Sequence, residues 1–262
     1  MTAGRNATRR NRNIGTAKQG IGQNNKFEIP VHQYSDKTVF HYENLKNYRS
    51  VKRVINTSLI SFLVEETRDD CIHACTIDDI TRVLQHVPSA ELEGITLIVL
   101  RQPKRKEEIL SSAWGRYIYY AEIDEYRGSA ICLEAHPLTQ PMRWPKSLFP
   151  DSQIELERLK SDGHSVTTAK RHHIVSADLT VVRTTQLYRT LLHEIGHHVD
   201  RMKDEDKFSF KTSKDKEIFA HKYADTLRKS LEQRGILPFE RILNLNSLDT
   251  DKLRISDFQA IY

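Results

Sequence analysis

The chain has 262 residues, of which 38% are hydrophobic and 29% charged, and this composition indicates a globular protein rather than a fibrous or wholly disordered one. Its longest apolar runs, such as Leu97–Leu100, are far too short to cross a bilayer, and no apolar run follows the basic residues near the N-terminus. We therefore expect no membrane span, and a location that is cytoplasmic or exported without a conventional signal peptide. The three cysteines are too few for a disulfide framework.

The net charge of +5 arises in the N-terminal tail. Residues 1–27 contain six Lys or Arg residues and no acidic residue, so the remaining body carries a charge of −1. The tail also lacks apolar anchors, and we expect it to be disordered because burial cannot offset the entropy lost on ordering. A near-neutral body argues against nucleic-acid binding, except weakly through the basic tail.

Helices are predicted in the region of about residues 28–90. From about 48 to 67, apolar residues recur at spacings of mostly three and four, the period of an amphipathic helix. Thr76 followed by Asp79 resembles a capping box, in which a hydroxyl and a carboxylate bind backbone N–H groups at a helix start. We expect a short helix from there toward Pro88.

The pattern then changes to that of strands. Residues 94–101, 117–123 and 129–135 are rich in β-branched, aromatic or other apolar side chains, which predicts three strands of a mixed or mostly antiparallel sheet. Four prolines within residues 136–150 predict an irregular loop, since each proline removes a backbone donor. We expect a short helix and a loop over 151–175.

Two long helices are predicted in the C-terminal half. A strand at about 178–183 leads into a helix over about 184–203, and a second helix over about 215–233 ends near Gly235. A small sheet together with these helices indicates the α+β class. We expect one domain over 28–262, in which a helical N-terminal part precedes a sheet and a functional site after about residue 91.

The helix predicted over 184–203 carries the motif His193-Glu194-Ile-Gly-His197. Residues four apart lie on one face of a helix, so both imidazoles can bind one metal ion, and imidazole suits Zn²⁺. Glu194 lies one residue round the helix, where its carboxylate can accept a proton from water beside the metal. An apolar stripe on roughly the opposite side indicates that the histidines do not face the core. The stripe consists of Tyr188, Leu192, Ile195, Val199 and Met202.

A zinc hydrolase needs a third protein ligand besides two histidines. Aspartates and histidines soon after the motif are candidates, notably Asp200 and His221, but Glu217 is favoured. It lies 20 residues after His197, at the edge of the apolar face of the second long helix. The polar linker at 204–214 would let that helix fold back beside the first one.

These motifs resemble those of the gluzincin zinc metallopeptidases. The segments His193–Asp200 (HEIGHHVD) and Glu217–Ala220 (EIFA) are similar to motifs of the anthrax lethal factor-like peptidases, and the resemblance covers about residues 184–228 and a sheet upstream. It implies a zincin-like domain that holds one Zn²⁺ ion and hydrolyses a peptide or protein substrate as an endopeptidase. The zinc ligands that it implies are His193, His197 and Glu217, and the implied general base is Glu194.

Two positions depart from the resembled families. Lethal factor-like enzymes have a tyrosine seven residues before the third ligand, which stabilises the oxyanion, and here that position is Phe210. The thermolysin-like group has an aspartate four residues after the ligand, and here that position is His221. The donor to the transition state therefore stays open among four residues, His221, Tyr223, His198 and Tyr119.

Other interpretations remain beside the peptidase. The lack of a hydroxyl at Phe210 favours, as an alternative, a zincin-like zinc-binding interaction module without turnover. A second, structural zinc site would need Cys71, Cys75, Cys132 and His136. Because the two pairs are 57 residues apart and Cys132 falls in a predicted strand, we expect buried cysteines instead.

Overall fold

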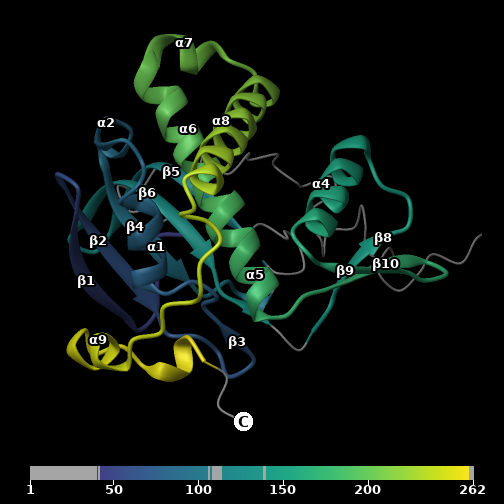
Figure 1. The fold of residues 1–262 in the computed structure, drawn as a ribbon, viewed down its shortest axis with the longest axis horizontal. Coiled ribbons are helices and arrows are strands. Elements are labelled where there is room, and N and C mark those ends of the chain that lie inside the picture. Colours follow the sequence, from purple (N-terminus) through teal and green to yellow (C-terminus); the bar gives the residue numbers. More distant parts are fainter. Residues whose placement is uncertain (1–39, 41, 106, 108–113, 138–139, 260–262) are drawn as a thin grey trace, which may run out of the picture. The chain divides into compact units, whose positions relative to one another are not determined.

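The computed structural model describes residues 40, 42–105, 107, 114–137 and 140–259. The described residues from Phe40 onward form one compact unit of strands and helices, which confirms the α+β class (Figure 1). The tail predicted to be disordered, 1–27, and the expected domain start at residue 28 lie outside the described residues. None of the described helices is long and apolar enough to cross a membrane.

The largest sheet has five strands. In the order in which they pair, these are β1 (Tyr48–Ile55), β2 (Ser58–Glu65), β4 (Ile95–Arg101), β6 (Tyr126–Glu134) and β5 (Gly115–Ile123). β2, β4 and β6 are parallel to one another, whereas β1 and β5 are antiparallel to their neighbours, so the sheet is mixed as predicted. The three predicted strands correspond to β4, β5 and β6, and β5 forms one edge of the sheet (Figure 1).

The helix predicted over 48–67 is wrong, because this segment forms the hairpin of β1 and β2. Asn56 adopts a left-handed backbone with a φ of 54°, which asparagine tolerates in a tight turn. Val54 and Leu59, which fitted the helical spacing, are cross-strand partners and are 70% and 58% exposed. The apparent helical period arose because the residues of two strands were read as one continuous element. The N-terminal part therefore contributes strands to the sheet and is not mainly helical.

Two smaller sheets accompany the first. One pairs β8 (Met142–Pro145) and β9 (Ser165–Thr168) with β10 (His172–Ser176) between them, and the other pairs β3 (Cys71–Ile72) with β7 (His136–Pro137). The segment predicted as an irregular loop therefore contains two short strands, while its residues 138–139 lie outside the described part. The short helix expected within 151–175 is α4 (Pro150–Ser161), with Pro150 in its first turn.

Helix α1 (Ile77–Leu84) begins where the capping box predicts. The Thr76 hydroxyl accepts a hydrogen bond from the Asp79 N–H, and the Asp79 carboxylate accepts one from the Thr76 N–H. The other described helices are α2 (Ser89–Leu92), α5 (Leu179–Thr185), the π-helical turn η2 (Gln186–Thr190), α6 (Leu191–Lys203), α7 (Glu205–Phe210), α8 (Ser213–Gln233), α9 (Leu245–Thr250) and the 3₁₀ turn η3 (Ile255–Asp257).

The strand predicted over 178–183 is also wrong. The Asp178 carboxylate accepts a hydrogen bond from the Val181 N–H and caps α5, so the β-branched run is helical. α5, η2 and α6 follow one another without a break, and the motif-bearing helix therefore starts earlier than predicted. The second long helix is α8, close to its predicted bounds.

One hydrophobic core lies between the five-stranded sheet and helices α1, α6 and α8. Leu192, Ile195 and Val199 of α6 are buried in it, as the predicted stripe requires. Met202 departs from the stripe, because it lies in the last turn of α6 and is 57% exposed. The opposite face of the sheet packs a second, smaller core.

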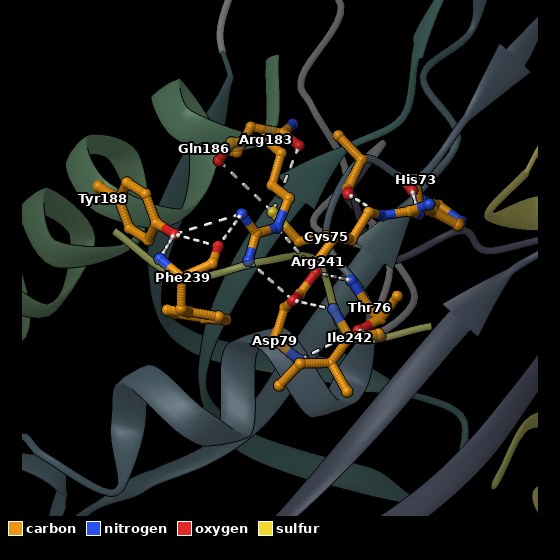
Figure 2. A network of polar contacts seen from close by, with 11 residues as sticks. His73, Cys75, Thr76, Asp79, Arg183, Gln186, Tyr188, Phe239, Arg241 and Ile242 are labelled. Atoms are coloured by element: carbon orange, nitrogen blue, oxygen red, sulfur yellow. Dashed lines mark hydrogen bonds and ion pairs between the residues drawn. The ribbon is translucent and has the colours of Figure 1, made fainter. Parts of the chain in front are cut away.

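A buried polar network fixes α5 against α1 (Figure 2). The Arg183 guanidinium donates to the two carboxylate oxygens of Asp79 at 2.9 and 3.1 Å. Arg183 also donates to the Tyr188 hydroxyl and to the carbonyl oxygen of Phe239, and the Ile242 N–H donates to Asp79 at 3.0 Å. Both charges are thus paired and hydrogen-bonded, as buried charges must be.

Candidate metal site

Three side chains lie together where α6 meets α8. His193 and His197 extend from α6, and their Nε2 atoms are 3.0 Å apart. Glu217 of α8 places Oε2 3.2 Å from the Nε2 of His193, and Oε1 3.4 Å from the Nε2 of His197. This group can hold a metal ion, and it is the single cluster of three or more such ligands in the part of the chain that the structure describes.

A close approach of the two helices brings Glu217 to the histidines. A Cβ atom added at Gly196 would lie 2.9 Å from the Cα and 3.0 Å from the carbonyl oxygen of Ala220. Backbone atoms cannot move aside cheaply, so only glycine allows α8 to pack this tightly against the motif. Gly196 lies between the two histidines, and Ala220 follows Glu217 by one turn. The motif glycine therefore sets the distance between the two helices at the site.

Glu194 lies beside this group on α6 and is only 7% exposed. Its Oε2 accepts a hydrogen bond of 2.7 Å from the backbone N–H of Tyr117 on β5. Burial raises the pKa of Glu194 above its ordinary value. Glu217 shows the opposite effect, because hydrogen bonds with His193 and His197 hold its pKa well below the usual range. The two carboxylates therefore have different acidities within one site.

A cavity of about 480 Å³ opens over these side chains. The start of β5 forms one wall and Phe208 of α7 contributes another part. The lining residues are Gly115, Arg116, Tyr117, His193, Glu194, His197, Phe208 and Glu217. A cavity bordered by a sheet edge and by the candidate ligands has room for an extended chain segment beside a metal ion.

The two rivals of Glu217 lie outside the ligand group. The Asp200 side chain is buried, and its Oδ1 accepts a hydrogen bond of 2.5 Å from Lys211 Nζ. His221 lies nearer, with its ring centroid 4.3 Å from that of His193, but its Nε2 is 2.7 Å from Arg158 Nη1. Burial lowers the pKa of His221 to about 4, with contributions from His193 and Arg158. Neither residue belongs to the cluster of ligand atoms.

The candidates for a transition-state donor do not line this cavity. The Tyr223 hydroxyl donates to Glu91 at 2.5 Å. His198 is 1% exposed, and its two ring nitrogens contact the carbonyl oxygen of Glu93 and the hydroxyl of Tyr117. Tyr119 is 56% exposed and stacks on Arg201. His221 borders a neighbouring cavity instead, and Phe210 is 89% exposed.

The cysteines form no second ligand cluster among the described residues. Cys71, Cys75 and Cys132 are buried, as expected. Cys132 lies in β6, and its pKa is raised by burial, as is that of Cys75. Buried neutral thiols of this kind pack as small apolar side chains.

Two features of the site were missed in the sequence. The Tyr117 N–H reaches Glu194 because Tyr117 lies on an edge strand, and strand order could not be predicted from the alternation of residues alone. The contact of Gly196 with Ala220 was missed because it joins two different helices. A glycine within a helical pattern is a signal of close packing and could have pointed to this contact. Comparison with protein-family models, with curated proteins and with solved structures found no match to this chain.

Proposed function

We propose that the chain is a zinc-dependent metalloendopeptidase of the gluzincin type with a zincin-like fold. The spacing of the ligand atoms carries this proposal. A tetrahedral ion with bonds of about 2.0–2.1 Å separates its ligand atoms by about 3.3 Å. The two histidine Nε2 atoms are 3.0 Å apart, and each lies near one oxygen of Glu217, His193 at 3.2 Å from Oε2 and His197 at 3.4 Å from Oε1. Each of these separations is close to that value, which supports a site for such an ion.

The chemistry of the ligands supports zinc. Two imidazole nitrogens and one carboxylate oxygen form a ligand set of catalytic zinc sites, which leaves a fourth position open for water or substrate. Glu217 is 53% exposed on its side chain, so the group opens toward the cavity rather than being sealed as in a structural site. When bound, Zn²⁺ would supply a Lewis acid that polarises a peptide carbonyl and acidifies water.

Glu194 would act as the general base. Its carboxylate lies next to the ligands without being one of them, and its burial favours accepting a proton. It would take a proton from the attacking water and pass it to the leaving amine. The Tyr117 N–H holds the carboxylate in place through a bond of 2.7 Å.

Strand β5 would align the substrate. Its segment Gly115–Tyr117 lines the cavity and belongs to the edge of the sheet, where an extended peptide can add as a further strand. A polypeptide backbone is the ligand that such an edge recognises, and this supports a peptide or protein substrate.

A zinc-binding interaction module without turnover is the second candidate. The observation that favours it is that none of the four candidate donors lines the cavity, while Phe210 carries no hydroxyl. A site without a donor to the developing oxyanion loses roughly 10²–10³-fold in rate. Turnover on peptides separates the two candidates.

The test compares the zinc-loaded wild type with Glu194→Gln on a library of peptides. We expect the wild type to cleave peptides and to stop when a chelator is added. Glu194→Gln should bind one zinc ion per chain and lose nearly all turnover, since an amide cannot accept the proton. Glu240→Gln, at an exposed glutamate, is the matched control and should keep full activity. An active Glu194→Gln variant would refute the mechanism, and a wild type that binds zinc without cleaving any peptide would favour the interaction module.

A further inference from the structure

A second cavity lies beside the candidate metal site and has no part in the function proposed above. It has a volume of about 500 Å³ and lies between α4, η2 and α8. Its charged and polar wall residues include Arg158, Asp162, Arg189, His221, Asp225 and Arg228. We refer to it as the α4–α8 cavity. His221 connects the two sites, because its ring is in this wall and also lies 4.3 Å from the ring of His193.

Two of the three arginines in this wall are held by carboxylates. Arg189 donates to Asp162 at 2.7 Å and to Glu155 at 2.8 Å. Arg228 donates to Asp162 at 3.3 Å and to Glu232 at 2.9 Å. The Asp162 side chain is 2% exposed and forms ion pairs with both guanidinium groups, so its negative charge is balanced within the wall. These ion pairs account for the structure of the wall.

Arg158 differs from its neighbours. Its Nη1 donates to the Nε2 of His221 at 2.7 Å, and it forms a long ion pair with the Glu155 carboxylate at 3.9 Å, beyond hydrogen-bond distance. Its Nε and Nη2 make no hydrogen bond with the residues that the structure describes. The wall has three acidic residues. Asp162 is paired as described above, and Glu157 pairs with Lys160 at 2.7 Å. The third, Asp225, is exposed.

His221 does not neutralise Arg158. A guanidinium donates and never accepts, so the Nε2 of His221 must be the acceptor and carries no proton. A histidine ring carries no negative charge in either protonation state, so it leaves the charge of Arg158 unbalanced. A cation with free N–H groups thus lies at 34% exposure on a cavity wall, one side chain away from the candidate metal ligands.

We propose that the α4–α8 cavity is a substrate subsite in which Arg158 binds a carboxylate of the peptide. This inference rests on the proposed function only for its placement beside the scissile bond. The fork of N–H groups on a guanidinium matches the two oxygens of a carboxylate, and such charge-assisted bonds are the strong ones. The carboxylate can come from an acidic side chain or from a free C-terminus, and the two sources imply different cleavage patterns.

Binding without turnover tests this subsite. Fluorescently labelled hexapeptides are titrated into the zinc-loaded Glu194→Gln chain and followed by anisotropy. One peptide set carries a single Glu at each position in turn with an amidated C-terminus, a second carries Gln with a free C-terminus, and the reference carries Gln with an amide. We expect one carboxylate set to bind at least about tenfold more tightly than the reference, the effect of one charge-assisted hydrogen bond.

The variants decide whether Arg158 is responsible. Arg158→Gln should abolish the preference for the carboxylate and leave binding of the neutral reference within about twofold, and Arg158→Lys should restore part of it. Lys160→Gln, on the same helix but outside the cavity wall, should keep the full preference. Equal binding of all three peptide sets, or a preference that survives in a folded Arg158→Gln chain, would overturn the proposal. A wild type without turnover would refute the peptidase but leaves this binding result interpretable.

Discussion

At the scale of single residues, two buried histidines make the fold sensitive to acid. His73 is 2% exposed, and its Nε2–H donates to the carbonyl oxygen of Glu65 at 2.7 Å. His164 is 4% exposed and contacts the Thr185 hydroxyl. Burial lowers the pKa of each ring to about 4, and around His73 the charges of Asp257 and Arg254 act in opposite directions. Both rings are therefore neutral in the folded chain at neutral pH.

The folded state binds fewer protons here than the unfolded state, whose histidines titrate near pH 6.5. The stability due to a neutral His73 is therefore complete above about pH 6.5 and is lost as the pH falls toward 4. We expect the free energy of unfolding to decrease by about 3 kcal/mol over this interval for His73 alone. Urea titrations at several pH values measure it. His73→Gln, whose amide can still donate to Glu65, should flatten this acid limb, and an unchanged slope would contradict the assignment.

The residues of the candidate site were the most predictable from the sequence. The four-residue spacing of His193 and His197 fixes their common face, because a helix has a constant period. Glu217 could be placed because a polar linker joins two predicted helices. The donor could not be placed, since Tyr119, His198 and Tyr223 turn away through contacts with partners distant in sequence. Such contacts depend on tertiary packing and leave no local pattern.

At the scale of elements, the packing of α8 on α6 determines the position of the candidate third ligand, Glu217. The backbone of Ala220 would lie about 3 Å from a Cβ atom at Gly196. Any side chain there must push α8 outward, and Glu217 moves with it. The distance between the helices, rather than the ligand residues alone, therefore sets the geometry of the site.

Gly196→Ala should accordingly weaken zinc binding while leaving the fold in place. We expect the zinc dissociation constant to rise at least about tenfold, because the carboxylate no longer reaches the position set by the two histidines. Competition with a chromophoric chelator measures the constant. Ala220→Gly changes the facing residue without adding an atom to the contact and costs only helix propensity, so this variant should bind zinc as the wild type does. Equal affinities of Gly196→Ala and the wild type would show that the contact does not position Glu217.

Elements were predictable where local chemistry and tertiary structure agree. The capping box at Thr76 and the bounds of α8 depend on neighbouring residues, and both were found. The predictions for segments 48–67 and 178–183 were wrong in opposite senses, since a predicted helix proved to be two strands and a predicted strand proved to be helical. In the first, a turn at Asn56 divided an apparently helical pattern into two strands, and in the second, a cap at Asp178 overrode β-branched propensity.

At the scale of the whole compact unit, the site lies between parts fixed by different interactions. The apolar core holds α6 against the sheet, and the ion pair of Asp79 with Arg183 joins α1 to the start of the same continuous helix. That network also includes Phe239 and Ile242 from the C-terminal segment. The candidate base thus contacts β5 on one side, while its helix is anchored at the other end. A rigid support of this kind is what a metal site needs to hold its ligand atoms in place.

The central claim is that His193, His197 and Glu217 bind one zinc ion, and a zinc titration of Glu217→Ala tests it most directly. The matched control is Asp200→Asn, which changes the aspartate on α6 that rivals Glu217 as third ligand. The wild type and the control should bind one ion per chain with similar affinity, whereas Glu217→Ala should bind it more weakly by at least two orders of magnitude. Wild-type affinity in Glu217→Ala, or loss of zinc in a folded Asp200→Asn chain instead, would contradict the proposed ligand set.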